Sequence, residues 1–275
     1  MRRLKLYISA DIEGVSGVVH SEHTARNGKE HDRARMYMTQ EINACINGAL
    51  EVGVTEIVVN DSHGTMRNIL LEQLHPRAEL ISGSPKKFAM VEGLNETFDV
   101  VIFIGYHTRM GTNGILNHTF HGKAIQTIKI NGVDYGEFGL NAALAGYHGV
   151  PLVMVSGCDL LSKEATELIP TIHTATVKKT INRTTAQNLS LDRSHEIIKS
   201  ETIKGIKNKD NIKPFNFKGS LEVEVSFLHS GLADMAEILP IVKRKDTTSV
   251  TFTTENILDA YRYIRSIIMM VSSGT

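Results

Sequence analysis

The 275-residue sequence is poor in cysteine and has no long apolar run. Its only cysteines, Cys45 and Cys158, cannot build a disulfide framework, so we expect a protein of a reducing compartment, the cytoplasm. No segment approaches the roughly 20 apolar residues of a membrane-spanning helix. The basic start of the chain is followed by an apolar run that stops at Asp11, which is too short for a secretory signal. We therefore expect neither secretion nor membrane insertion.

The sequence also lacks an excess of charge of either sign. Lysine and arginine together number 30, as do aspartate and glutamate. This balance lacks the basic surplus that is typical of proteins that bind nucleic acids or acidic membrane surfaces. With 41% hydrophobic and 22% charged residues, the composition is that of an ordinary globular protein. The expected ligand is a small molecule or a peptide.

Common nucleotide-binding and nucleophile motifs are missing as well. Residues 11–17, DIEGVSG, lack the G-x-G-x-x-G spacing, and their acids would repel a pyrophosphate. The sequence contains no Walker-type loop. Residues 84–87, SPKK, match S-x-x-K without its companion motifs, so we interpret Ser84 and Pro85 as the N-cap and first residue of a helix. Cys158 is interpreted as a small buried side chain rather than a nucleophile.

Short apolar runs alternate with longer segments of helical periodicity. This alternation predicts an α/β fold, with a mostly parallel sheet flanked by helices. The apolar runs predict strands at residues 4–10, 56–61, 78–83, 100–105 and 151–157. The helical segments are residues 30–52, 65–74, 137–147, 184–206 and 256–271. Asn131–Gly132, between alternating apolar and polar residues, predicts a β-hairpin.

The character of the sequence changes in its last quarter. Residues 221–227, LEVEVSF, alternate apolar and polar side chains, as in a sheet with one face in solvent. We expect a smaller C-terminal α+β unit here. The predicted division is a metal-binding catalytic domain at 1–200 and a smaller α+β domain at 201–275, with the boundary between 190 and 215.

Polar side chains follow most of the predicted strands. In open α/β sheets, ligands bind beyond the carboxyl ends of the strands, so these side chains are expected to gather at one edge. Nine of the 12 histidines also fall at or before His148. The candidates, in chain order, are Asp11, Glu13, Asp61, His63, His107, Glu137, Cys158 and Asp159.

Carboxylates and imidazoles without thiolates favour Zn²⁺ or a neighbour such as Mn²⁺. The residues alone leave one or two metals open. Each candidate also has an ordinary structural interpretation: Asp11 and Glu13 as a solvated turn, His63 as a helix cap, and Glu137 as a first-turn acid. Their joint placement favours a single site over separate coincidences.

A family resemblance becomes visible at these residues. Residues 9–14, Ser-Ala-Asp-Ile-Glu-Gly, match the pattern S-x-D-x-E-G. The match continues in order through VNDSHG (59–64), HPRAELISG (75–83), MVEGL (90–94), FIGYH (103–107), GEFGLNAALAGY (136–147) and ELIP (167–170). In these segments the chain resembles the zinc-dependent D-aminopeptidases of peptidase family M55.

The resemblance implies two zinc ions held by Asp11, Glu13, His63, His107 and Glu137, with one carboxylate bridging them. It implies that His118, in LNHT, is the catalytic histidine. The implied reaction is release of N-terminal D-amino acids, of the D-alanine type, from short peptides by a two-zinc-activated water. The implied assembly is a ring-shaped homo-oligomer, a decamer, with the sites facing an internal chamber.

Two rival functions remain open from the sequence. The first keeps the metal but changes the amide, as in a γ-D-glutamyl or N-acyl hydrolase. The second is a non-catalytic peptide-binding accessory of a transport system, in which the metal only holds a ligand. Paired D- and L-dipeptides and acylated substrates separate the first from an aminopeptidase, and tight binding without turnover would indicate the second.

Overall fold

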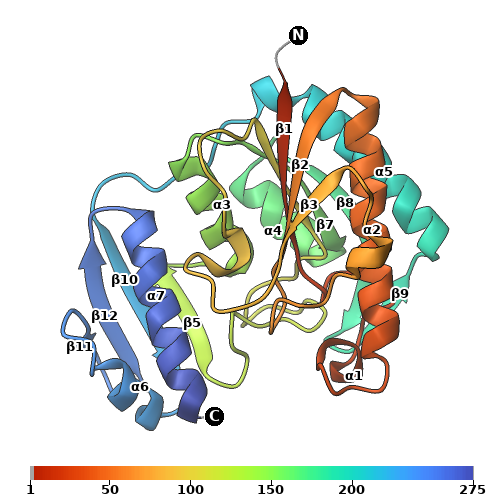
Figure 1. The fold of residues 1–275 in the computed structure, drawn as a ribbon. Helices are drawn as coiled ribbons and strands as arrows, with labels where there is room; N and C mark the ends of the chain where they lie inside the picture. The colour runs from red at the N-terminus through yellow and green to blue at the C-terminus, as the bar shows by residue number, and fades with distance from the viewer. Residues whose placement is uncertain (1–2, 275) are drawn as a thin grey trace.

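A seven-stranded sheet forms the centre of the molecule in the computed structural model, which describes residues 3–274 (Figure 1). All neighbouring strands run parallel except the last pair, which confirms the predicted mostly parallel sheet. The strands, in spatial order, are β3 (Ala78–Ile81), β2 (Val54–Asp61), β1 (Leu4–Ala10), β4 (Val100–Ile104), β7 (Leu152–Cys158), β8 (His173–Asn182) and β9 (Thr185–Asn188).

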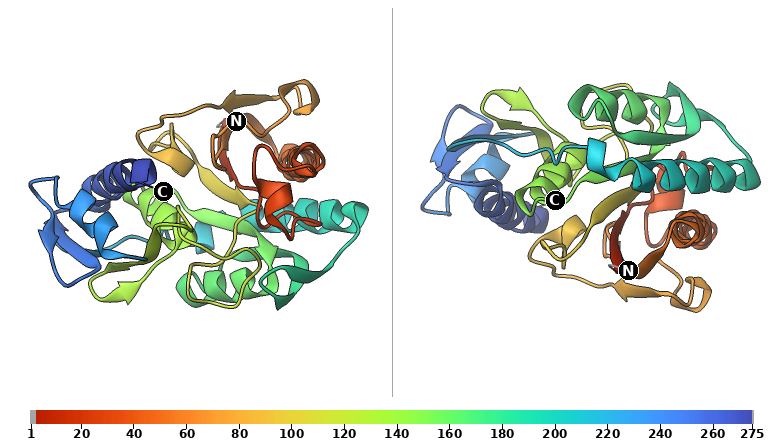
Figure 2. Two further views of the ribbon diagram at one scale, coloured as in Figure 1. Left: turned by 90° about the horizontal axis from the view of Figure 1, so that it is seen from below. Right: turned by 90° about the horizontal axis from the view of Figure 1, so that it is seen from above.

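Helices cover both faces of this sheet. Helices α2 (His31–Glu51) and α5 (Leu191–Lys207) pack together on one face, and α3 (Glu137–Tyr147) and α4 (Asp159–Leu168) lie on the other (Figure 2). The predicted apolar stripe of α2 is fully buried, and its members are Ala34, Met38, Ile42, Ile46 and Ala49. None of the helices among residues 3–274 is long and apolar enough to cross a membrane.

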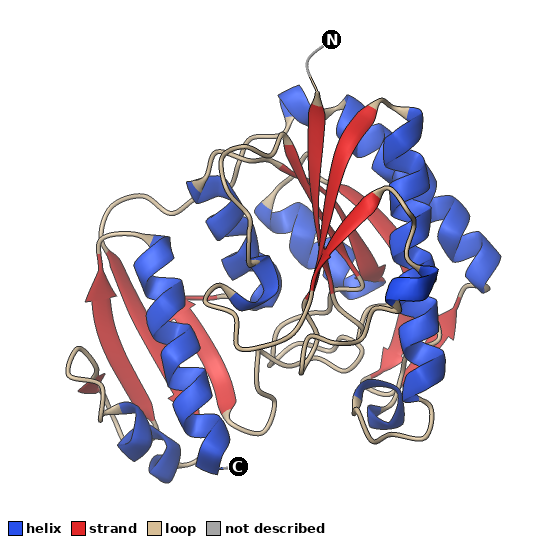
Figure 3. Ribbon diagram, viewed as in Figure 1, coloured by secondary structure: helices blue, strands red, loops and turns tan. Residues whose placement is uncertain are grey.

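A second, antiparallel sheet of five strands lies beside the first (Figure 3). Its strands, in spatial order, are β11 (Lys243–Arg244), β12 (Ser249–Thr254), β10 (Leu221–Phe227), β5 (Ile125–Ile130) and β6 (Val133–Asp134). Two helices pack on it, α6 (Ser230–Ala236) and α7 (Ile257–Val271). Because β5 and β6 come from the first half of the chain, this sheet draws on both sides of residue 200, and the division at 200 stays a prediction about folding units.

The predicted hairpin at Asn131–Gly132 is confirmed. It joins β5 to β6, and both residues have positive φ, 52° and 82°. This is the backbone that a two-residue hairpin turn requires and that Asn-Gly adopts readily. The alternation of β10 is confirmed too, because its odd-numbered residues from Leu221 to Phe227 are buried.

The predicted helix at 65–74 is wrong. Only the 3-10 turn η1 (Leu71–Gln73) forms there. Met66 has a φ of 57°, outside the helical region, and the backbone N–H groups of Asn68 and Ile69 donate to the Asp61 carboxylate instead of to a helix. Asp61 lies on the preceding strand, only seven residues before Asn68, but its hydrogen bonds cannot be inferred from hydrophobic periodicity, so this side-chain contact overrides the local helix propensity.

The helix predicted to start at Pro85 is wrong as well. The Ser84–Pro85 peptide is cis, and the chain reaches only a 3-10 turn, η2 (Ala89–Val91). Lys86 turns inward, and its ammonium donates to Asn60 Oδ1 and the Asp61 carbonyl. Residues 184–206 are helical only from Leu191, and strands β8 and β9, which the sequence did not predict, come before. The remaining short elements are α1 (Ser21–Thr24), η3 (Lys209–Asn211) and η4 (Ser272–Gly274).

The chain order across the central sheet reverses between β1 and β4. From β1 the chain continues to β2 and β3 on one side, and from β4 it continues to β7 and β8 on the other. The loops that leave these adjacent strands therefore diverge and open a crevice at their carboxyl ends, which is where open α/β sheets bind ligands.

Candidate metal centre

The loop after β1 carries Asp11 and Glu13. The strand ends at Ala10, so the two acids lie beyond it and do not share one face of an extended strand. A turn brings them together instead, and both are buried, with 2% and 4% of their surface exposed. They are therefore not the solvated turn that the sequence left open.

Two glycines allow this loop to cross the loop after β4. The Gly14 N–H donates to the Gly105 carbonyl at 2.7 Å. A Cβ on Gly14 would lie 2.0 Å from the Tyr106 carbonyl oxygen, and a Cβ on Gly105 would lie 2.2 Å from that of Asp11. No side chain fits at either position, which explains the glycine of the S-x-D-x-E-G segment.

The other predicted residues reach the same place from three further segments. His63 follows β2, His107 follows β4, and Glu137 is the first residue of α3. His118 lies in the loop between β4 and β5, with 19% of its side chain exposed. All six predicted site residues are thus brought together at the carboxyl ends of β1, β2 and β4.

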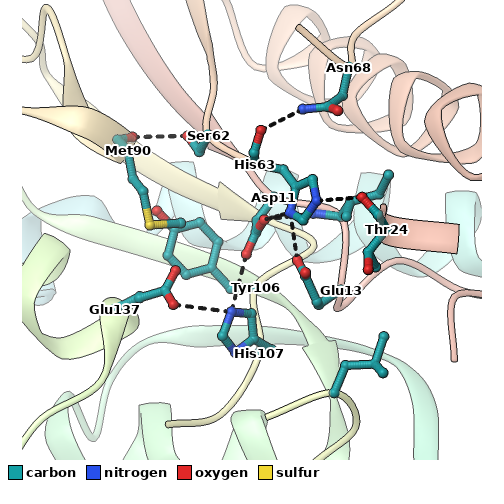
Figure 4. Close-up of polar contacts among 12 residues, drawn as sticks. Asp11, Glu13, Thr24, Ser62, His63, Asn68, Met90, Tyr106, His107 and Glu137 are labelled. Atoms are coloured by element: carbon teal, nitrogen blue, oxygen red, sulfur yellow. Dashed lines mark hydrogen bonds and ion pairs between the residues drawn. The ribbon is translucent and has the colours of Figure 1, made fainter. Parts of the chain in front are cut away.

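Asp11 lies at the middle of this cluster (Figure 4). One of its carboxylate oxygens is 3.2 Å from His63 Nδ1, and the other is 3.4 Å from His107 Nε2. His63 Nδ1 is also 3.0 Å from Glu13 Oε2, and His107 Nε2 is 3.4 Å from Glu137 Oε1. Asp11 therefore faces two separate sets of possible metal ligands, one with His63 and Glu13 and the other with His107 and Glu137.

His118 completes the second set. Its Nε2 is 3.8 Å from Glu137 Oε1, and its ring stacks on that of His107, with the centroids 4.2 Å apart and the planes at 12°. The donor atoms form two groups of three within which all atoms lie within 4.8 Å of one another: Asp11, Glu13 and His63, and His107, His118 and Glu137.

Backbone carbonyls fix the direction of each imidazole. His63 Nε2 donates to the Thr24 carbonyl, His107 Nδ1 to that of Thr108, and His118 Nδ1 to that of Leu116, each at 2.9 Å. The other ring nitrogen of each histidine is thereby directed toward the carboxylates. Such an outer hydrogen bond is typical of metal-ligating histidines, because it sets the tautomer and holds the ring.

Electrostatics show that the cluster attracts positive charge. Burial alone would lower the pKa of His107, but Glu137 and Asp11 raise it to about 10. Burial also opposes protonation of His63, yet Glu13 and Asp11 raise the pKa of this imidazole well above its usual value. Burial and the neighbouring Glu13 raise the pKa of Asp11 to about 7. Protons on the imidazoles balance the carboxylates, and a divalent cation would balance them equally well.

The donor set fits a metal. Glu13 Oε2 and His107 Nε2 are fully buried, yet neither makes a hydrogen bond of good geometry within residues 3–274 despite its short contacts. Buried polar atoms that converge without hydrogen bonding are uncommon and require an explanation. Carboxylate oxygens and imidazole nitrogens aimed at a shared point are the ligands that zinc prefers.

The other acids named from the sequence lie outside this cluster. Asp61 accepts hydrogen bonds from Asn68 and Ile69, and so shapes the loop that carries His63. Asp159 opens α4 and accepts from the Thr180 N–H at 2.8 Å. Cys158 is a buried free thiol, in keeping with its interpretation as a small core side chain. Of the eight candidates named from the strand ends and α3, Asp61, Cys158 and Asp159 therefore do not join the cluster.

Sequence reasoning missed the residues that hold the Glu13 loop from below. The Lys178 ammonium is buried and donates to the carbonyls of Glu13, Val15 and Val18 at 2.6, 2.9 and 2.6 Å. Glu41, on α2, accepts from the Ser16 N–H at 2.9 Å. The sequence offered no signal for either residue, because β8 had not been predicted and the burial of Lys178 and Glu41 is visible only in the structure.

Two cavities meet at the cluster. The smaller has a volume of about 120 Å³, and its lining includes Asp11, His63 and Glu137. The larger has a volume of about 810 Å³, and its lining includes Glu13. The two cavities share Gly64, His118 and Phe120. His118 thus stands where a small pocket joins a large one.

Comparison with known proteins agrees with this geometry. Residues 4–266 match the family model of Peptidase M55, described as D-aminopeptidase. The chain is 41% identical over 260 residues to a D-aminopeptidase of Bacillus subtilis (strain 168), covering 94% of each chain. The solved structure of the Zn-dependent D-aminopeptidase DppA from Bacillus subtilis, described as a self-compartmentalizing protease, superposes with a TM-score of 0.95 at 39% identity and 98% coverage of both chains. The chain belongs to peptidase family M55, the D-aminopeptidases.

Proposed function

We propose that this protein is a zinc-dependent aminopeptidase that removes N-terminal D-amino acids, D-alanine in the first place, from short peptides. The observation that carries the proposal is the pair of three-residue donor groups joined through Asp11 at the junction of two cavities. The names of its M55 relatives support the same activity and the D-configuration.

The proposed centre holds two zinc ions. Asp11, Glu13 and His63 would hold one, and His107 and Glu137 would hold the other together with Asp11. Asp11 would contribute to both ions, because its two oxygens face the two histidines at 3.2 and 3.4 Å. When bound, the metal would supply an activated water and polarise the scissile carbonyl.

His118 is proposed to move the proton. Burial, together with the neighbouring His107, lowers the pKa of His118, so its Nε2 is unprotonated near neutral pH and can accept a proton. Its position between the cavities lets it return that proton to the amine nitrogen of the departing peptide. Peptide-bond cleavage needs this transfer, because an amide anion is a poor leaving group.

The direct test of this role is His118→Asn, compared with His229→Asn on the exposed loop before α6. We expect His118→Asn to lower kcat on a D-alanyl dipeptide by about 10²- to 10⁴-fold, the usual size of a general acid–base contribution. Zinc content should stay unchanged, and the control should match the parent protein. Undiminished hydrolysis by a zinc-loaded His118→Asn would remove the residue from the mechanism.

The metal and the substrate class are tested together. Protein stripped with a chelator should lose hydrolysis of D-alanyl peptides and regain it on addition of about two equivalents of zinc per chain. L-peptides, N-acyl peptides and γ-D-glutamyl peptides serve as comparison substrates. Faster turnover of acylated or γ-D-glutamyl substrates would replace the aminopeptidase with the amidohydrolase alternative. Binding without turnover would indicate a peptide-binding accessory.

Assembly and location belong to the same proposal. The solved relative is described as self-compartmentalizing, and we expect this chain to form a ring-shaped homo-oligomer, a decamer, as well. Exposed apolar side chains such as Leu71 and Ile238, 67% and 71% exposed in the single chain, offer surface for such contacts. Native mass spectrometry should find about ten times the chain mass of 30.4 kDa, and a monomer would contradict the ring. Two buried free thiols fit a cytoplasmic location.

A further inference from the structure

The larger cavity is lined by more basic than acidic side chains, and these basic side chains have no part in the metal centre. Its lining includes the cations Lys123 and Arg183 and the imidazoles His20 and His121. Its only acid is Glu13, which is already engaged with His63 at the centre. Neither Lys123 nor Arg183 forms an ion pair with any carboxylate of residues 3–274, whereas six of the other eleven arginines in that range have such a partner.

Arg183 is held firmly beside His118. It lies in the turn between β8 and β9, where its carbonyl accepts from the Leu116 N–H at 2.8 Å. Its guanidinium donates through Nε to Asn117 Oδ1 at 3.1 Å and through Nη2 to the Asn117 carbonyl at 3.4 Å. Nη1 donates to no acceptor within the described part of the chain. A guanidinium fixed in this way loses little side-chain entropy on binding a ligand.

The cavities differ about sevenfold in volume, and this fixes the direction of the peptide. An aminopeptidase must accommodate one residue before the scissile bond and an open length of chain after it. The 120 Å³ cavity suits the single N-terminal residue, and the 810 Å³ cavity suits the remainder. In the shortest substrate, a dipeptide, that remainder is one residue that ends in a free carboxylate.

We infer that Arg183 and Lys123 form a carboxylate subsite that selects short peptides with a free C-terminus. This inference rests on the proposed aminopeptidase function and adds its substrate class. Guanidinium and ammonium groups are the donors that bind carboxylates most strongly. Because Arg183 is bonded to the residue that precedes His118, docking of the carboxylate and placement of the proton-transfer histidine depend on one loop.

The test compares a D-alanyl dipeptide with its C-terminal amide, a pair that differs only in the charge at this subsite. In the parent protein we expect kcat/KM to favour the acid by about tenfold or more, as for a charge-assisted hydrogen bond. The preference should shrink as salt is added, because the cations are exposed. Lys123→Met and Arg183→Met should each lower kcat/KM for the acid and bring the acid-to-amide ratio toward one. Lys163→Met, an exposed cation on α4, is the matched control and should leave the ratio unchanged.

Four results would overturn the inference, and the last of them would overturn the proposed function with it. Equal hydrolysis of acid and amide by the parent protein would do so while leaving the aminopeptidase proposal intact. A ratio that survives both substitutions would also do so. If the acid-to-amide ratio fell to one only in Arg265→Met, the substrate carboxylate would bind in the smaller cavity instead. There the Arg265 Nε is buried without a hydrogen-bond partner among residues 3–274. Failure to hydrolyse either peptide would refute the proposed function, and the subsite would fall with it.

Discussion

Glu41 offers a quantitative test of how the Glu13 loop is supported. Its side chain is fully buried on α2, and it accepts from the Ser16 N–H while its Oε2 has no partner among the described residues. Burial raises the pKa of this carboxyl from 4.5 to about 7, although Ser16 and Lys178 oppose the rise. The folded protein therefore binds a proton at Glu41 over a range of pH in which the unfolded chain has already lost it.

The direction of the pH effect follows from linkage. Because the folded pKa lies above the unfolded one, the contribution of Glu41 to stability is greatest below pH 4.5 and is lost as the pH rises through 7. With these two pKa values, titration of Glu41 lowers the free energy of unfolding, relative to a fully protonated carboxyl, by about 0.8 kcal/mol at pH 5 and by about 3.2 kcal/mol at pH 7.5. Ionisation of Glu41 thus costs about 2.4 kcal/mol over this interval.

Glu41→Gln isolates this effect, because glutamine keeps the acceptor for Ser16 and does not titrate. In urea denaturation at matched protein and zinc concentrations, the free energy of unfolding of the variant minus that of the parent should rise by about 2.4 kcal/mol between pH 5 and pH 7.5. Stopping at pH 7.5 keeps Lys178 mostly charged, since burial lowers its pKa to about 8. Glu72→Gln, exposed in η1, should show no such trend. A difference that stays constant with pH would mean that Glu41 is ionised throughout, and it would refute the reasoning.

Two further substitutions test the supports of the metal centre. Lys178→Met removes three hydrogen-bond donors from the loop that carries Glu13, so zinc affinity measured against a competing chelator should fall about tenfold or more. Lys179→Met, at the exposed neighbouring residue, is the control. An unchanged zinc affinity in Lys178→Met would show that Lys178 does not support the metal centre. Gly14→Ala places a methyl group 2.0 Å from a carbonyl oxygen, and it should lower the free energy of unfolding by about 3 kcal/mol or more. Gly231→Ala, where a Cβ meets only ordinary contacts, should not, and near-normal stability of Gly14→Ala would contradict the predicted clash.

The sequence predicted best where one physical constraint dominates a segment. Three patterns are each compatible with only one local structure, and each formed as expected: the continuous apolar run of β4, the apolar stripe of α2 and the Asn-Gly turn. Residues 65–74 failed because the Asp61 carboxylate takes the N–H groups that a helix would need. Strand β8 was missed because its second half, residues 178–182, is largely polar, although the strand pairs with β7 and contacts helices α4 and α5.

The candidate site was predictable in its membership but not in its geometry. Asp11, His63 and His107 could be grouped because parallel strands share one carboxyl edge, and this rule needs no coordinates. That Asp11 divides its two oxygens between the two histidines could not be foreseen, since it depends on how the loops after β1 and β4 cross. Lys178 and Arg183 were not predictable either, because their partners lie far away along the chain.

The supports explain how so many like charges can be buried together. Three carboxylates within one cluster repel one another, and in the absence of constraint the loops would separate until water reached them. The chain opposes this separation with hydrogen bonds placed outside the cluster: from a lysine to the carbonyls of the Glu13 loop, between glycines where the loops cross, and from each imidazole to a backbone carbonyl. None of these bonds is made to a carboxylate oxygen of the cluster, so they hold the loops and rings in place without engaging the oxygens that face a cation. The negative potential that results remains available to a cation, which is the property that the proposed chemistry requires.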